Sequence, residues 1–448
     1  MCAPARVSTV GAMETLTHSQ AVDIAARVRA GQLSPREVVD ACLARIAATD
    51  PGIGAFQLVD AEGARRAADA LSRRPDLSGL ALAGVPVAVK DNLDVAGLPT
   101  RYGSAATADA PADRDDELVA RLRAAGAIVV GKTRMPELAI WGFTESRAFG
   151  GTRNPRDPSR NAGGSTGGGA AAVAAGMVPL ALGSDGGGSL RIPAANCGVV
   201  GLKPGRAVTA LASSHWYGCT AFGPITATVA DAALALDVLA GAHRWRDVTP
   251  SGEPLRVAVS LRSPSPIGRP DAGARAAVEL AATLLAPVVR ADPPYPMTLI
   301  NSWVRHWLAG VALDAEQLGL DESRLEPRTR AVIARGRRLR RHGRPDPAES
   351  AAWRRKARDW FAGVDVLVTP VVARPAPLAG WGTDTGYLRA YLNAARGIPY
   401  TQAWNLAGLP ALSLPLGGTP DRPGAVQLVS TDETTLLRAA ARLEQAAD

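Results

Sequence analysis

A run of three consecutive glycines between two apolar segments limits how the centre of this chain can fold. Gly186, Gly187 and Gly188 follow the apolar segment 178–182 and directly precede Ser189. Glycine loses more backbone freedom on folding than any other residue, so a glycine run within ordered structure needs a compensating reason. A flexible linker would have polar residues on both sides. We therefore predict a buried loop whose bare backbone allows another group to approach several N–H groups.

The composition is that of a globular protein with a large core. Of 448 residues, 47% are hydrophobic and 21% are charged, and the formal net charge is +8. A chain of this length can form one large α/β domain or two smaller ones. Residues 324–344 are dense in arginine and could form a nucleic-acid patch, but no nucleic-acid-binding motif accompanies them. A solvated helix is the favoured interpretation, and we expect no nucleic-acid partner.

The cysteines and the N-terminus favour a cytoplasmic protein. The cysteines are Cys2, Cys42, Cys197 and Cys219. They have no CxxC spacing, which favours reduced and mostly buried thiols. Residues 1–16 contain no apolar segment typical of a signal peptide, and either Met1 or Met13 could be the start. The apolar stretch 170–182 is too short to span a membrane and contains a proline, so no membrane association is expected.

Helical and strand patterns alternate along the sequence and predict an α/β fold. Residues 84–89 predict a buried strand, and residues 117–132 predict a helix followed by a strand, the unit of a parallel sheet. Residues 222–241 predict one long apolar helix, and residues 364–372 and 409–416 predict late strands. We expect a large mixed, mostly parallel-type central sheet covered by helices on both faces. The pattern in residues 245–360 is too weak to assign elements.

Ser165 lies in a short motif that could be a nucleophile elbow. Residues 163–167 match G-x-S-x-G, which requires a preceding strand and an acid and a histidine further along the chain. Residues 151–162 are not strand-like, and the downstream histidines have no recognisable setting. A phosphate-binding interpretation of residues 167–169 lacks both the preceding strand and a Walker lysine. A Ser-His-Asp esterase is therefore the weaker hypothesis.

Lys90 is a candidate base because it ends an apolar strand in a chain that otherwise uses arginine. Lysine accounts for four of the 50 basic residues, and arginine cannot lose its proton in proteins. Burial lowers the pKa of a lysine, and a neutral lysine can act as a base. An ion pair with Asp91 or Asp94 is the competing interpretation, which the pattern leaves open. Lys132 and Lys203 share the argument but have no serine cluster nearby.

Three segments, residues 85–100, 150–204 and 405–417, together resemble the amidase signature family. By motif position, Lys90 matches the lysine of K-D-N and Ser165 matches the bridging serine of G-G-S-S-G-G. Ser189 matches the nucleophile of G-G-S-[IL]-R. The resemblance implies a Ser–cis-Ser–Lys triad with a cis peptide before Ser165, and neither a metal nor a cofactor. It also implies one domain over residues 1–448, with the signature core at about 80–205 and a divergent substrate-pocket region at about 245–405.

The resemblance also assigns the glycine run to an oxyanion hole. It implies that backbone N–H groups from Gly186 to Ser189 stabilise the negative charge that develops on the carbonyl oxygen, with Ala139 beside the substrate. Asp185 and Arg191 are expected to pin the loop as a pair behind it. The usual T-D-T-G-G-S is S-D-G-G-G-S at residues 184–189, which removes bulk from the loop.

These residues predict hydrolysis of a carboxylic amide to a carboxylate and ammonia or an amine, through an acyl-enzyme on Ser189. One alternative is the glutaminase subunit of a tRNA-dependent amidotransferase, although residues 205–224 are more similar to free amidases. A non-catalytic scaffold is a third alternative, against which the intact triad argues. The predicted partner is a small-molecule amide, and a homodimer is left open.

The resemblance implies that the acyl pocket is built by divergent segments, expected at residues 130–145 and 300–405, and the aromatic residues there suggest the nature of the substrate. The tryptophans concerned are Trp141, Trp303, Trp307 and Trp404. If they line the pocket, they favour an apolar or aromatic acyl group, whereas core packing is the competing interpretation. Residues 215–217, His-Trp-Tyr, are expected to project bulk toward the substrate.

Overall fold

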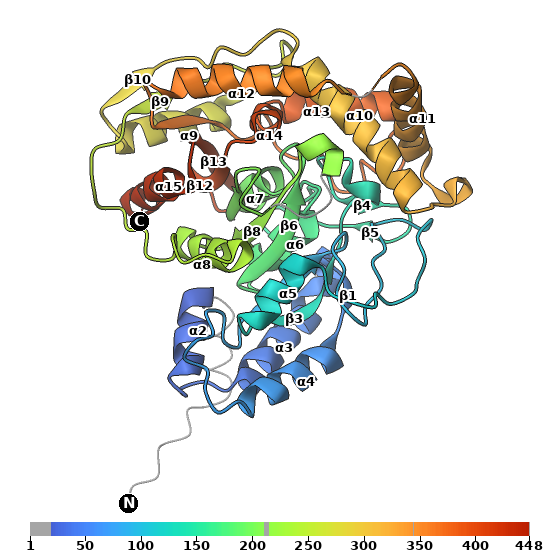
Figure 1. The fold of residues 1–448 in the computed structure, drawn as a ribbon, viewed down its shortest axis with the longest axis vertical. Coiled ribbons are helices and arrows are strands. Elements are labelled where there is room, and N and C mark those ends of the chain that lie inside the picture. Colours follow the sequence, from blue (N-terminus) through green and yellow to red (C-terminus); the bar gives the residue numbers. More distant parts are fainter. Residues whose placement is uncertain (1–18, 210–214, 344, 448) are drawn as a thin grey trace, which may run out of the picture.

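One sheet of eleven strands, drawn from both ends of the described chain, forms the framework of the molecule (Figure 1). The computed structural model describes residues 19–209, 215–343 and 345–447. Cys2, Met1 and Met13 lie outside these residues. In sheet order, the strands are β1 (Phe56–Val59), β3 (Ile128–Thr133), β2 (Pro86–Lys90), β6 (Leu180–Asp185), β8 (Ala221–Thr226), β7 (Val200–Lys203), β12 (Ala411–Thr419), β13 (Arg422–Val429), β11 (Val366–Pro370), β9 (Val257–Val259) and β10 (Val288–Arg290). A separate two-stranded sheet contains β4 (Glu145–Ser146) and β5 (Gly150–Gly151).

The described residues also form fourteen α-helices and three short 3₁₀ turns. The α-helices are α2 (Ala21–Arg29), α3 (Pro35–Ile53), α4 (Ala61–Ser72), α5 (Glu117–Ala124), α6 (Gly167–Ala174), α7 (Arg191–Cys197), α8 (Val229–Ala240), α9 (Ala272–Leu284), α10 (Leu299–Gln317), α11 (Pro327–Arg341), α12 (Pro347–Phe361), α13 (Tyr387–Gly397), α14 (Gln402–Ala407) and α15 (Glu433–Ala447). Short 3₁₀ turns are η1 (Glu137–Ala139), η2 (His215–Gly218) and η3 (Glu322–Arg324).

The two faces of the sheet have different partners. Leu428 of β13 belongs to a buried apolar cluster that also contains residues of α8, α9 and α15. The preceding residue, Gln427, points to the opposite face because successive strand residues alternate. There its Oε1 accepts a hydrogen bond from Arg191 of α7. Helices therefore cover both faces, as predicted, and α7 lies on the face opposite α9 and α15.

The sheet is mixed, as predicted, but it is not mostly parallel. Among the described strands, four neighbouring pairs are parallel, namely β2–β3, β2–β6, β9–β10 and β9–β11. The other six neighbouring pairs are antiparallel. The predicted helix–strand unit is correct, because α5 connects the parallel strands β2 and β3. The prediction of mostly parallel pairing fails where a short connection joins neighbouring strands, because such a connection requires antiparallel pairing, as in the β12–β13 hairpin.

The prediction of one helix over residues 222–241 is wrong in its first part. Residues 221–226 form β8, and α8 begins only at Val229, capped by the Thr228 side chain. Both ends of this segment are apolar, and an apolar run alone does not separate a buried strand from a buried helix. β8 is a strand because it lies between β6 and β7 and completes their hydrogen bonding.

Three further sequence expectations concern the cysteines, membrane-spanning helices and the arginine-dense segment. Cys42, Cys197 and Cys219 are free and buried, as expected. Within the described ranges, none of the helices combines the length and apolar character needed to cross a membrane. The arginine-dense segment forms η3 and α11, where Arg337 and Arg340 pair with Glu316 of α10.

Candidate active site

Lys90 lies at the end of β2 and contacts hydroxyl groups rather than a carboxylate. Its side chain is fully buried, and its Nζ lies 2.7 Å from Ser165 Oγ and 2.9 Å from Ser184 Oγ. Asp91, a suggested partner, is bound instead to Lys132, with 3.1 Å between Asp91 Oδ1 and Lys132 Nζ. The competing interpretation of Lys90 as half of an ion pair with Asp91 is therefore wrong.

The surroundings of Lys90 favour its neutral form. Burial lowers the pKa of Lys90 to about 7, because the ammonium loses its hydration and the charge of Asp185 compensates only in part. At neutral pH, Lys90 is therefore in its neutral form in a large fraction of the molecules, and its nitrogen then carries a free lone pair. Since Ser165 Oγ is within hydrogen-bond distance, this lone pair can accept the proton of the Ser165 hydroxyl.

Ser165 lies in a tight turn immediately before α6. The peptide bond between Gly164 and Ser165 is cis, as the family resemblance implied. Residues 162–166 form no strand, so the strand-to-helix turn required of a nucleophile elbow is absent here. Ser165 is fully buried, its hydroxyl is bound to Lys90, and it lines a cavity that Ser189 also lines.

The three consecutive glycines form a buried loop between β6 and α7, as predicted. A Cβ atom on Gly186 would lie 2.6 Å from the Trp216 ring, and one on Gly187 would lie 2.4 Å from the Trp303 ring. A Cβ on Gly188 would lie 2.3 Å from Thr401 Oγ1, and this residue has a φ of +119°. Each glycine is therefore required by the close approach of a neighbouring side chain.

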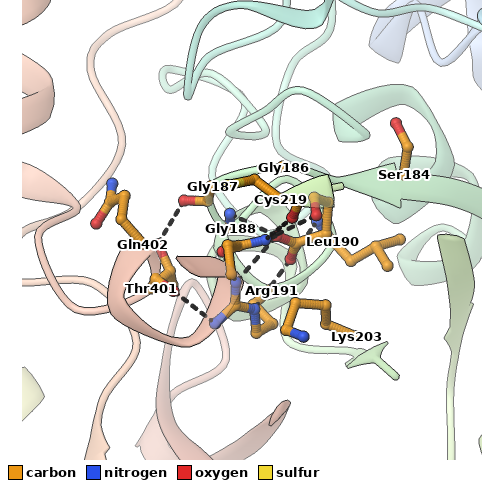
Figure 2. Close-up of polar contacts among 12 residues, drawn as sticks. Ser184, Gly186, Gly187, Gly188, Leu190, Arg191, Lys203, Cys219, Thr401 and Gln402 are labelled. Carbon is orange, nitrogen blue, oxygen red and sulfur yellow. Dashed lines mark hydrogen bonds and ion pairs between the residues drawn. The ribbon is translucent and has the colours of Figure 1, made fainter. Parts of the chain in front are cut away.

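Two side chains from distant segments hold the carbonyl groups of this loop. The Trp303 indole Nε1–H donates to the Gly186 carbonyl at 2.9 Å. The Thr401 hydroxyl donates to the Gly187 carbonyl at 2.6 Å. Figure 2 shows Thr401 beside the loop, with the Thr401 carbonyl bound by Arg191. With their carbonyls fixed in this way, the peptide planes of the loop have a defined orientation.

Asp185 and Arg191 form the expected pair behind the loop. Both side chains are fully buried, and Arg191 Nε and Nη2 each donate to the Asp185 carboxylate at 2.9 Å. Burial alone would raise the pKa of Asp185, but the charge and hydrogen bonds of Arg191, with Lys203 nearby, hold it well below its ordinary value. The carboxylate is therefore ionised over the physiological pH range.

The same carboxylate determines which backbone N–H groups remain for a substrate. The Gly188 N–H donates to Asp185 Oδ1 at 2.6 Å, so it is directed into the protein. Of the predicted oxyanion donors, the N–H groups of Gly186, Gly187 and Ser189 therefore remain as candidates. The sequence prediction included the Gly188 N–H among the oxyanion donors, and its hydrogen bond to Asp185 argues against that role.

Ser189 is partly exposed and lies where two cavities meet. The first, of about 70 Å³, is mostly apolar and also contains Ala139 and Trp216. The second, of about 170 Å³, shares Ala139, Trp216 and Ser189 with the first and also contains Ser165. Ala139 has a φ of +59° and donates its N–H to Pro136 at 3.0 Å. A larger cavity of about 710 Å³ beside α13 contains none of the predicted site residues.

The aromatic residues of the sequence prediction divide into two groups. Trp141, Trp303 and Trp307 line the apolar cavity, and the rings of Trp303 and Trp307 are stacked with their centroids 5.8 Å apart. Trp404 is fully buried, packs against Trp353 and is not among the residues that line this cavity. The expectation that Trp404 contributes to the pocket is therefore wrong, because its ring is covered by core residues.

Several site residues could not be identified from the sequence. Ser184 contacts Lys90 within the signature segment, where Asn92 also donates to Ser184 Oγ at 3.1 Å. Thr401 and Asp314 reach the site from distant helical segments that have no recognisable motif. Asp314 lies in the second cavity, where its Oδ2 accepts a hydrogen bond from Trp216 Nε1 at 2.8 Å.

Comparison with known proteins identifies the family. The Amidase family model matches residues 37–437. A Mycobacterium tuberculosis protein named "Putative amidase AmiB2" is 42% identical over 434 residues, which cover 93% of each chain. An Anaeromyxobacter subunit of glutamyl-tRNA(Gln) amidotransferase is 39% identical, over 94% of each chain. The chain therefore belongs to the amidase signature family and is an amide hydrolase.

The fold comparison agrees with this assignment. The solved structure of 6-aminohexanoate cyclic dimer hydrolase in complex with its substrate matches with a TM-score of 0.84 and 30% sequence identity. The match covers 96% of this chain and 97% of that protein. Because nearly the whole of both chains is aligned, the likeness includes the divergent segments around the apolar cavity.

Proposed function

We infer that the protein hydrolyses a carboxylic amide through an acyl-enzyme on Ser189, with Ser165 and Lys90 as the proton relay. The observation that carries this proposal is the 2.7 Å contact between Lys90 Nζ and Ser165 Oγ, in a buried site beside Ser189. A lysine without a carboxylate partner is suited to accept a proton, and a serine at a cavity junction is suited to meet a substrate.

The proposed reaction follows from these positions. Ser189 Oγ attacks the carbonyl carbon while its proton passes to Ser165 and the Ser165 proton passes to Lys90. The negative charge on the carbonyl oxygen is stabilised by the free N–H groups of the loop. The C–N bond then breaks as the relay returns one proton to the nitrogen, which leaves as an amine or as ammonia. Water attacks the acyl-enzyme through the same relay and releases the carboxylate.

The apolar cavity supports an apolar or aromatic acyl group. Trp141, Trp303 and Trp307 line it next to Ser189, together with aliphatic residues that include Ile300 and Ile398. A flat acyl group that contacts these rings gains both buried apolar area and favourable ring geometry. Aryl-substituted carboxamides are therefore the first substrates to test.

The nucleophile is tested by labelling and substitution. We expect a fluorophosphonate to form a covalent adduct on the peptide that contains Ser189, and Ser189→Ala to abolish both the adduct and amide hydrolysis. Ser413→Ala is the matched control, because Ser413 is a buried serine of β12. Mass spectrometry of the digested protein locates the adduct. An adduct on Ser165, or full activity of Ser189→Ala, would contradict the proposed roles.

A glutaminase subunit is the second candidate, favoured by the 39% identity to a subunit of an amidotransferase. Such a protein must bind the polar side chain of glutamine next to its nucleophile. The cavity beside Ser189 has tryptophans in that position, which supports the free amidase. Hydrolysis of glutamine in preference to aryl carboxamides, or co-purification with partner subunits on gel filtration, would favour the glutaminase instead.

A further inference from the structure

The two cavities that meet at Ser189 differ in their access to the proton relay. Ser165 and Ser184, the two hydroxyl groups in contact with Lys90, both line the second cavity. Neither belongs to the lining of the apolar cavity, which contains Gly164 and the tryptophans instead. The relay therefore opens toward only one of the two cavities.

This difference determines the orientation of a bound amide. The leaving nitrogen must receive its proton from the relay, so it must lie on the side of Ser189 where Ser165 is found. The acyl group, on the other side of the carbonyl carbon, then extends into the apolar cavity. The second cavity is left for the substituent on nitrogen during acylation, and for water during hydrolysis of the acyl-enzyme.

The walls of the second cavity are suited to a substituent that donates hydrogen bonds. Asn92 Oδ1 is buried and has no hydrogen-bond partner among the described residues, while Asn92 Nδ2 is bound to Ser184. Asp314 also lines this cavity, and His215 lies close enough to interact with its charge. Trp216 donates to one oxygen of Asp314, and a carboxylate has about four acceptor positions, so this group can accept further hydrogen bonds.

Trp216 fixes the position of this carboxylate. Its ring is held between Gly186 and Gly310, where an added Cβ atom would lie 2.6 Å from the ring in either case. The indole Nε1–H reaches Asp314 Oδ2 at 2.8 Å. Asp314 is therefore a carboxyl group held in a fixed position in the cavity that also contains Ser165 and Ser189. Burial raises its pKa, and a cationic group bound beside it would favour the ionised form.

We propose that this cavity binds the amine half of the substrate and selects amines that carry a second, cationic group, with Asp314 as the specificity-determining residue. The inference rests on the proposed amidase function. During acylation the C–N bond breaks and the nitrogen takes the proton from Ser165, while the distant cationic group stays bound to Asp314 and changes neither its bonds nor its proton.

The test compares two amides of the same aryl acid. Their amine halves are n-butylamine and 1,3-diaminopropane, which differ only in a terminal methyl or ammonium group. We expect the wild-type kcat/KM to be at least about tenfold higher for the aminopropyl amide, because hydrogen bonds to charged groups are the stronger kind. Asp314→Asn should reduce this ratio to near one, and it retains an oxygen that can accept from Trp216.

The control is Glu316→Gln, which removes the same charge from the same helix. Glu316 pairs with Arg337 and Arg340 and is not part of either cavity, so the ratio should stay at the wild-type value. A wild-type ratio of kcat/KM values of one or less, or an unchanged ratio in Asp314→Asn, would overturn this inference but leave the proposed amidase function standing. Failure to hydrolyse either amide and the corresponding primary amide would overturn the proposed function, and this inference with it.

A second measurement needs only the wild-type protein. An ester of the same aryl acid would form the acyl-enzyme, and an added amine can then react with it. This amine enters the cavity from which an amine product leaves. We expect 1,3-diaminopropane to form its amide more efficiently than n-butylamine, by a similar factor of about ten. Equal capture of the two amines would contradict the assignment of Asp314.

Discussion

At the scale of single residues, three buried lysines show how surroundings determine chemistry. Lys132 is paired with Asp91, and Lys203 donates to the carbonyl of Pro204 at 2.9 Å. Only Lys90 contacts the hydroxyls of the site, through Ser165 and Ser184. Burial lowers the pKa of both Lys90 and Lys203 to about 7. The pKa alone therefore does not distinguish these two lysines, whereas the contact with Ser165 supports Lys90 as the proposed base.

The pH dependence of the reaction follows from the lowered pKa of Lys90. In the proposed mechanism the neutral form is the proton acceptor, so kcat/KM should reach its plateau about one pH unit above the pKa and fall as the pH decreases through about 7. Lys90→Arg retains the charge but cannot accept a proton, so we expect its rate to fall about 100- to 10,000-fold, close to that of Lys90→Ala. The measurement is kcat/KM against pH for each variant.

Two sets of variants exclude other groups that titrate in this range. Lys203→Met removes the second lysine with a pKa of about 7, and histidine-to-alanine variants remove side chains with an ordinary pKa near 6.5. Each of these variants should keep the midpoint of the acidic limb at about pH 7. A shifted midpoint in one of them, or substantial activity in a folded Lys90→Arg protein, would show that Lys90 is not the acceptor.

At the scale of elements, the loop between β6 and α7 combines two requirements on the same residues. It must be narrow enough for Trp216 and Trp303 to pack against it, and in the proposed mechanism its N–H groups must face the cavity at Ser189. Carbonyl contacts from Trp303 and Thr401 fix two of its peptide planes. The loop is thus held by elements that lie more than a hundred residues further along the chain.

A single added methyl group tests this arrangement. Gly187→Ala would place a Cβ atom 2.4 Å from the Trp303 ring, so either the ring or the loop must move. We expect kcat to fall about 100- to 1,000-fold, as for the loss of one oxyanion donor, while the protein remains folded. Gly363→Ala is the control, because a Cβ there meets open space. Near-normal kcat in Gly187→Ala would show that the loop geometry does not matter.

At the scale of the whole molecule, Arg191 connects the signature segment with the C-terminal part of the sheet. Besides Asp185, its Nη1 donates to the Thr401 carbonyl at 3.1 Å and to Gln427 Oε1 at 2.6 Å. Its Nη2 donates to Asn405 Oδ1 at 2.6 Å. One buried guanidinium therefore joins the loop, α14 and β13 on one face of the sheet.

Removing this guanidinium should destabilise the fold. Arg191→Met would leave the Asp185 carboxylate buried without its partner, which typically lowers the free energy of unfolding by about 3–5 kcal/mol. Arg256→Met is the matched control, because Arg256 and Asp365 form an ion pair at the surface, where solvent screens the interaction and its loss should change the free energy of unfolding much less. Urea denaturation followed by circular dichroism measures both. Equal losses in the two variants would contradict the role given to Arg191.

The sequence by itself determined those parts of the site that lie in short contiguous motifs. Lys90 ends an apolar strand, Ser165 lies among glycines, and Ser189 follows a glycine run, and each pattern reflects a local requirement of backbone or solvation. The helix–strand pattern of residues 117–132 was equally local, and α5 and β3 form as predicted. Such features are visible because neighbouring residues in the chain create them.

Only the tertiary structure decided which distant residues complete the site. Trp303, Asp314 and Thr401 come from segments without a motif, and their roles depend on how α10 and α14 pack against the loop. The tertiary structure also decided that residues 221–226 form a strand, because the gap between β6 and β7 supplies hydrogen-bond partners that the sequence pattern does not contain. Contacts across more than a hundred residues leave no periodic signal, since packing rather than local backbone preference selects them.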